Sequence, residues 1–195
     1  MKWAHYFFYN NILGWQDIGL ANPLPFCINQ YNRNNNEEIL CAVDTCNNIN
    51  SLYIVKERFH DTYVLEGDVY MDKNVLLSEV SQSTYFARKK KYENEWGLDV
   101  DDSNRLVKIN IGAGEGFLMS GISYWKKEDC QKIISHMEEV YATKDYTNLY
   151  WDNMVLDIYP ELDIYVREIE GIYEIDTPEE LKEVENKLSQ NYERN

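Results

Sequence analysis

The pattern of apolar and polar positions predicts intermixed strands and helices from about residue 47 onward. Short apolar runs at residues 63–66, 83–87 and 106–111 have the length and the β-branched or aromatic content of buried strands. Residues 117–125 form a further extended segment, and residues 162–169 alternate as a strand does. Strands interleaved with helices in this way are typical of an α/β sheet.

Four helices are predicted from spacing and end signals. Residues 127–141 place apolar side chains at helical intervals, which indicates an amphipathic helix with one face on a core. A shorter helix is expected from Asn50 or Ser51 to about Phe59, and another begins near Trp151.

The last helix has the clearest start. Thr177 and Glu180 have the spacing of a capping box, and Pro178 stands at the first helical position, so we expect a helix to about Leu188. Because Thr177 takes the cap, Asp176 lies one residue outside the helix and is available to a ligand.

Three glycines at Gly112, Gly114 and Gly116 follow a predicted strand. Their spacing matches neither G-x-G-x-x-G nor G-x-x-x-x-G-K, and the next residues read as a strand rather than a helix. We therefore reject a phosphate-binding loop and predict a hairpin turn over residues 112–116.

The first 46 residues differ from the rest. Helical and strand periodicity are both weak there, asparagines crowd residues 32–36, and an apolar cluster spans residues 3–9. We divide the chain into an atypical N-terminal segment, residues 1–46, and a domain over residues 47–195.

Composition narrows the function classes. The 195 residues include 34 acidic and 19 basic side chains, for a net charge of -15, which argues against nucleic acid as a partner. No apolar run reaches the roughly 20 residues of a membrane span, and no signal-peptide pattern opens the chain. The four cysteines form no C-x-x-C pair, so we expect neither zinc nor a disulfide framework, and a cytoplasmic location.

Carboxylates at predicted strand ends suggest a metal site. Asp68 follows a buried strand and a glycine, while Glu174 and Asp176 share one face of a later strand. Mg²⁺ prefers one or two carboxylates together with substrate phosphates. The alternative for each is an ordinary turn residue, and the metal site requires that the fold bring the two strands together.

Aromatic rings occur at residues 95–96, 124–125 and 150–152, and the first and last of these groups include an acidic residue, Glu95 and Asp152. Aromatic faces with a nearby carboxylate suit a quaternary ammonium group, which donates no hydrogen bonds and is held by cation–π attraction. The alternative is that the tryptophans pack in a core and that Asp152 caps a helix.

Seven segments occur in order at a spacing that matches a known family. They are residues 47–57 (NNINSLYIVKE), 63–70 (YVLEGDVY), 83–86 (STYF), 94–96 (NEW), 120–125 (SGISYW), 149–154 (LYWDNM) and 172–176 (IYEID). On these residues the chain resembles the bacterial Lic-type choline-phosphate cytidylyltransferases, a branch of the nucleotidyltransferases similar to sugar-nucleotide pyrophosphorylases. The resemblance covers about residues 47–190.

The resemblance implies a Rossmann-like mixed sheet flanked by helices and a reaction between CTP and phosphocholine that yields CDP-choline and pyrophosphate. It implies Mg²⁺ held by Asp68 and Asp176, with no catalytic side chain beyond these metal ligands. By the same resemblance, the phosphocholine-binding residues are Trp96, Trp125, Tyr150, Trp151, Asp152 and Glu174, and the nucleotide-binding residues are Asn47, Asn48 and Ser51.

The chain departs from the family at its start. Family members open with a strand and a loop of the form L-A-A-G-x-G-x-R, followed by Pro-Lys, which holds the triphosphate. Residues 1–46 contain no Gly-x-Gly, no Pro-Lys and only Lys2 and Arg33 as cations. We therefore expect purified protein to lack measurable CDP-choline synthesis at ordinary CTP concentrations. Two alternatives stay open: a non-catalytic phosphocholine-binding module, and a truncated remnant that needs a partner, for example a second copy of the chain.

Overall fold

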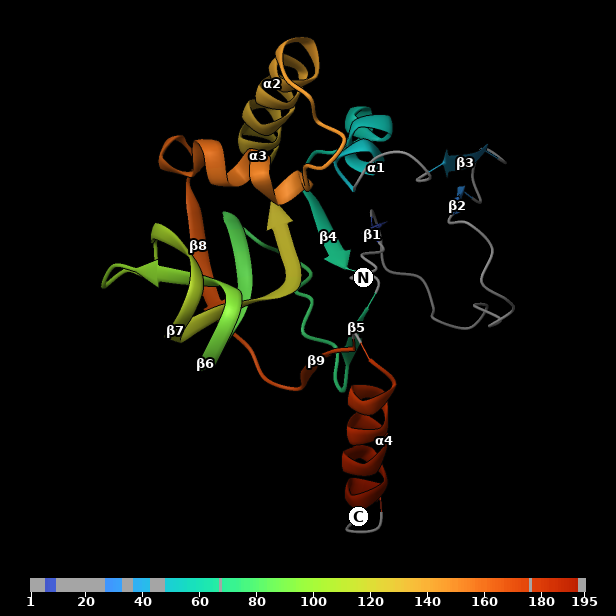
Figure 1. The fold of residues 1–195 in the computed structure, drawn as a ribbon, viewed down its shortest axis with the longest axis vertical. Coiled ribbons are helices and arrows are strands. Elements are labelled where there is room, and N and C mark those ends of the chain that lie inside the picture. Colours follow the sequence, from blue (N-terminus) through green and yellow to red (C-terminus); the bar gives the residue numbers. More distant parts are fainter. Residues whose placement is uncertain are drawn as a thin grey trace.

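The computed structural model describes residues 6–9, 27–32, 37–42, 48–66, 68–175 and 177–192. Its main sheet has five strands (Figure 1), in the order β1 (Tyr6–Tyr9), β4 (Thr62–Glu66), β7 (Leu106–Trp125), β6 (Ser83–Val100) and β8 (Ile164–Glu168). The β6–β8 pair is parallel and the other neighbours are antiparallel. This mixed sheet, with helices packed against it, confirms the predicted α/β class.

The helices lie close to where the sequence placed them. They are α1 (Ile49–Ile54), α2 (Lys127–Thr143), α3 (Trp151–Ile158) and α4 (Pro178–Tyr192), with short 3₁₀ turns at Lys56–Arg58 and Tyr159–Glu161. The first helix is shorter than predicted, since the chain tightens into the first 3₁₀ turn after Val55. The capping box of α4 is confirmed: the Glu180 N–H donates to the Thr177 hydroxyl at 3.2 Å, and the Thr177 N–H donates to the Glu180 carboxylate at 2.9 Å.

The predicted hairpin turn at residues 112–116 is wrong. Strands β6 and β7 form one long ribbon whose turn lies at residues 101–105, where the Asp101 carboxylate accepts hydrogen bonds from the Ser103 and Arg105 N–H groups. Gly112 and Gly116 lie inside β7 with φ values of 137° and 151°, a backbone conformation that side chains disfavour. The glycines therefore let the strand bend, so that the ribbon curls over itself.

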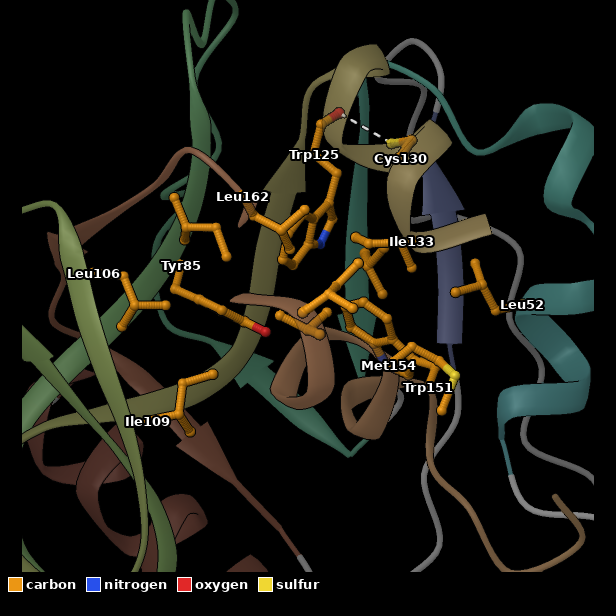
Figure 2. Packing of buried hydrophobic residues seen from close by; sticks show 14 of the residues in the cluster. Leu52, Tyr85, Leu106, Ile109, Trp125, Cys130, Ile133, Trp151, Met154 and Leu162 are labelled. Atoms are coloured by element: carbon orange, nitrogen blue, oxygen red, sulfur yellow. Dashed lines mark hydrogen bonds between the residues drawn. The ribbon is translucent and has the colours of Figure 1, made fainter. Parts of the chain in front are cut away.

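The sheet buries both of its faces. Val64 and Tyr85 belong to the larger core cluster, against α2 and α3, whereas their strand neighbours Tyr63 and Phe86 belong to a second cluster on the opposite face. Figure 2 shows the larger cluster, with Trp125 of β7 fully buried between sheet and helices. The second face is covered by residues 69–80 and by Ile172.

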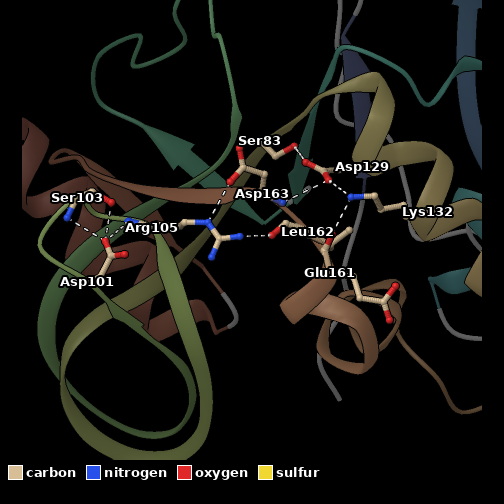
Figure 3. Close-up of polar contacts among 9 residues, drawn as sticks. All are labelled: Ser83, Asp101, Ser103, Arg105, Asp129, Lys132, Glu161, Leu162 and Asp163. Atoms are coloured by element: carbon tan, nitrogen blue, oxygen red, sulfur yellow. Dashed lines mark hydrogen bonds and ion pairs between the residues drawn. The ribbon is translucent and has the colours of Figure 1, made fainter.

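A buried carboxylate joins three parts of the fold. Asp129 of α2 accepts a hydrogen bond from the Ser83 hydroxyl of β6 at 2.6 Å and another from the Asp163 N–H, before β8, at 3.3 Å (Figure 3). The Lys132 ammonium lies 3.4 Å from the same carboxylate. These partners offset the cost of burying the charge.

Part of the N-terminal segment is ordered into strands that its weak periodicity did not predict. Strand β1 pairs with β4 at the edge of the main sheet, and β2 (Cys27–Asn32) pairs with β3 (Glu37–Ala42) as a separate two-stranded sheet. The two remaining strands, β5 (Val69–Met71) and β9 (Ile172–Glu174), form a further small antiparallel sheet. No helix in the described ranges is both long and apolar enough to cross a membrane.

Candidate functional site

The fold brings the predicted metal-binding strands together. Val69 pairs with Glu174, and the Ile175 N–H donates a hydrogen bond to the Asp68 carbonyl at 2.9 Å. Asp68, which directly precedes β5, therefore lies beside Glu174 on β9 although more than a hundred positions separate them in sequence, as the predicted metal site requires.

The metal site itself stays a prediction. Asp176 directly follows Ile175 but lies outside the described residues, as does Asn47. In the ranges that the structure describes, no three His, Cys, Asp or Glu side chains converge as a set of metal ligands. Asp68 and Glu174 offer hard carboxylate oxygens, which fit Mg²⁺ in chemistry.

Asn48 and Ser51, predicted to approach the nucleotide, are both buried, with 6% and 3% of their surface exposed. The Asn48 side-chain oxygen accepts a hydrogen bond from the backbone N–H of Trp151 at 2.8 Å. This N–H is one of the unsatisfied donors at the start of a helix, so Asn48 caps α3 from 103 positions away. The neighbouring Tyr150 N–H donates to the Asn153 side chain at 2.7 Å. The start of α3 is thereby held at two successive residues.

A small cavity lies beside the start of α3. Its volume is about 20 Å³, and its polar lining includes Glu66, Tyr85 and Asp152, with the Trp151 ring beside them. Gly121 also lines it, at φ 73°, where an added Cβ would lie 2.9 Å from a Glu66 carboxylate oxygen and 2.6 Å from a Val69 methyl. Glycine at this position therefore leaves room for the Glu66 carboxylate.

Burial dominates the electrostatics of Asp152. Asp152 is half-buried, and the loss of water around its carboxyl group raises the pKa to about 7. No lysine or arginine in the described part of the chain forms an ion pair with it. A cation bound in the cavity would supply that missing charge and favour the ionised carboxylate.

The aromatic residues divide into a lining ring and supporting rings. Trp151 lines the cavity, and Trp125 packs edge-on against it with ring centroids 5.7 Å apart. Trp125 is 0% exposed and its indole N–H donates to the Ser123 hydroxyl at 2.8 Å, so it supports Trp151 and Tyr85 from the core. Tyr150 is 41% exposed, and Trp96 on β6 packs partly buried against the larger cluster.

A second hollow, larger than the cavity beside α3, contains none of the predicted site residues. It measures about 440 Å³ and lies between residues 77–82 and strand β8. Its lysine, Lys89, is paired with Glu168 at 3.1 Å. We therefore place the site at the smaller cavity, which Asp152 and Trp151 line.

Sequence reasoning missed Glu66, Tyr85 and Gly121. Each belongs to a strand or a strand end within a matched segment, but each reads there as an ordinary strand residue. Only the pairing of β4, β6 and β7 next to α3 places them around one cavity.

Comparison with curated proteins identifies related enzymes. The chain is 39% identical over 145 residues to a choline-phosphate cytidylyltransferase of Streptococcus pneumoniae and 30% identical over 153 residues to one of Haemophilus influenzae. It is 31% identical over 141 residues to a 2-aminoethylphosphonate cytidylyltransferase of Lancefieldella rimae. These matches cover 73%, 76% and 69% of the chain and 63%, 66% and 57% of the relatives, so the chain spans less than two thirds of their length. No family model matches it.

Solved structures agree with this relationship. The CTP:phosphocholine cytidylyltransferase of Streptococcus pneumoniae superposes with a TM-score of 0.71 at 37% identity, over 74% of this chain and 64% of that one. A nucleoside-diphosphate-sugar pyrophosphorylase of Vibrio cholerae superposes with a TM-score of 0.51 at 14% identity, over 69% and 61% of the two chains, and shows the shared fold alone.

Proposed function

Because the chain is a homologue of the choline-phosphate cytidylyltransferases with a nucleotidyltransferase fold, we propose that it acts on phosphocholine and CTP. In this reaction a phosphate oxygen of phosphocholine attacks the α-phosphorus of CTP. The bond from that phosphorus to the β-phosphate oxygen breaks, so the products are CDP-choline and pyrophosphate. The observation that carries the proposal is Asp152, a carboxylate without an ion-pair partner in the described ranges, beside the ring of Trp151.

The choline head is a permanent cation that donates no hydrogen bonds. Trp151 presents a ring and Asp152 a carboxyl group at the same cavity, and a cation bound there would keep that carboxyl ionised. The cavity, at about 20 Å³, is smaller than a trimethylammonium head, so its lining has to open to take one. The bonds from Asn48 and Asn153 hold both residues at the start of α3. Their role in this proposal is to bind and orient the substrate, so that its phosphate meets CTP in one position.

Mg²⁺ belongs to the proposal as a cofactor. Asp68 and Asp176 would hold it, with Glu174 on the neighbouring strand, and the ion would supply charge neutralisation for the triphosphate. The pairing of residue 69 with residue 174 supports this assignment because it aligns the two strand ends. We also propose a cytoplasmic location, where CTP and phosphocholine are both expected.

A second candidate function is a phosphocholine-binding module without catalysis. It is favoured by the composition of residues 1–46, which contain no Gly-x-Gly and only two cations. The expectation that this chain turns over too little CTP to measure stays a prediction.

One experiment separates the two candidates. Purified protein is incubated with CTP, Mg²⁺ and phosphocholine, CDP-choline is quantified, and calorimetry measures the binding of each substrate alone. CDP-choline above the level of an Asp68→Asn control supports the enzyme and overturns the expectation of no turnover. Binding of phosphocholine without CTP binding or product supports the module. Binding of neither substrate contradicts both functions.

A further inference from the structure

The hydroxyl of Tyr85 is a buried polar group that the proposed function does not use. Tyr85 lies on β6 with 3% of its surface exposed, and its hydroxyl has no hydrogen-bond partner within the described ranges. Buried hydroxyls in native proteins almost always have a partner, because losing water without replacement is unfavourable. Figure 2 shows the hydroxyl directed toward α3.

Tyr85 lines the same small cavity as Glu66 and Asp152. Burial raises the pKa of Tyr85 well above its usual range, and the two carboxylates raise it further, so the hydroxyl keeps its proton. The cavity, at about 20 Å³, admits a group of the size of one water molecule or one ammonium. Three residues that carry oxygen groups thus border a space that fits a small cation.

The two kinds of cationic head use such a space differently. A primary ammonium carries three N–H donors, which match a hydroxyl oxygen and carboxylate oxygens as acceptors. A quaternary ammonium has no donor and depends on aromatic faces and net charge. A hydroxyl oxygen at this position therefore adds binding energy for the first kind of head and little for the second.

We propose that Tyr85 is a specificity-determining residue whose hydroxyl accepts a hydrogen bond from a primary ammonium head, so that the site also takes aminoalkyl phosphates or phosphonates. The inference rests on the proposed function, since it uses the same cavity and the same carboxylate. It goes beyond that function in naming a second class of substrate and the residue that recognises it.

The test compares two ligands on one variant. Calorimetry measures the affinities of phosphoethanolamine and phosphocholine for the full-length wild type and for Tyr85→Phe. Phenylalanine keeps the ring, which packs edge-on against Trp125 at 5.3 Å. We expect the variant to bind phosphoethanolamine about tenfold more weakly or worse, and phosphocholine less than about threefold more weakly.

Tyr124→Phe is the matched control, because Tyr124 lies on β7 and packs against Tyr63 in the cluster on the opposite face. It should change neither affinity, and thermal melts of both variants should show that each is folded. Equal losses for the two ligands in Tyr85→Phe, or no loss for either, would overturn the inference.

The outcomes also separate this inference from the proposed function. If the wild type binds phosphocholine but not phosphoethanolamine, the proposed function stands and the role of Tyr85 is overturned. If the wild type binds neither ligand, the proposed function itself fails, and the inference fails with it.

Discussion

Partial burial of Asp152 destabilises its ionised form and leaves the residue suited to bind a cation. Its carboxyl pKa is raised from an ordinary value of 3.8 to about 7 because protein replaces water around it. The fold therefore retains a destabilised carboxylate, which a bound cation would compensate.

A pH dependence of stability follows from that shift. The folded protein keeps the Asp152 proton up to about pH 7, while the unfolded chain loses it near pH 3.8, so the stability contributed by this group falls as pH rises between these values. Asp152→Asn cannot ionise and should escape this loss. In thermal melts from pH 4 to 8, the melting temperature of the variant should rise relative to that of the wild type up to about pH 7. Above that pH the difference should stay constant. A difference in melting temperature that does not change with pH would contradict the raised pKa of Asp152.

At the scale of elements, the start of α3 is positioned by a helix distant in the sequence. Asn48, next to α1, supplies the acceptor for the Trp151 N–H, and this contact orients the two cavity residues Trp151 and Asp152. Asn48 therefore has a positioning contact in the structure, and its role in nucleotide binding stays a prediction.

Replacing Asn48 tests this role. Asn48→Ala removes the acceptor and leaves a buried N–H, which should cost about 1–2 kcal/mol of stability and weaken phosphocholine binding several-fold. Asn48→Asp retains an acceptor oxygen and should recover most of the loss. Calorimetry and chemical denaturation measure the two effects.

Asn110→Ala, on the β6–β7 ribbon, serves as the control and should leave phosphocholine binding unchanged. Weaker CTP binding with intact phosphocholine binding in Asn48→Ala would contradict this positioning role and support the predicted role of Asn48 in nucleotide binding.

At the scale of the whole molecule, a few long-range contacts connect the layers. Asp129 joins α2 to the start of β6 and to the segment before β8, and Arg105 adds a bond from the ribbon turn to Asp163 at 3.0 Å. These contacts fix how the helices sit on the sheet and hence where α3 meets the cavity.

Asp129→Ala should therefore destabilise the fold broadly, by about 3 kcal/mol or more, because it leaves the Ser83 hydroxyl and the Asp163 N–H without their acceptor. Urea denaturation measures the loss. Asp102→Ala, at an exposed position in the ribbon turn, is the matched control and should change stability by less than about 0.5 kcal/mol. Equal stabilities for the two variants would show that the Asp129 contacts contribute nothing net.

Local patterns predicted the elements better than their connections. The spacing of residues 127–141 and the capping box at Thr177 correspond to α2 and α4, because helix signals act within a few residues. The turn at 112–116 was wrong because glycine permits a bend inside a strand as readily as a reversal. Strand β1 was missed because its place depends on pairing with β4, more than fifty residues later.

By itself, the sequence determined the α/β class, most helix positions, the likeness to choline-phosphate cytidylyltransferases and the acidic and aromatic residue types of the site. Only the tertiary structure decided which of these side chains share a space. It placed Trp125 in the core, gave Asn48 to the start of α3, and grouped Glu66 and Tyr85 with Asp152. The physical reason is that burial and desolvation depend on neighbours from distant strands, and no local pattern records them.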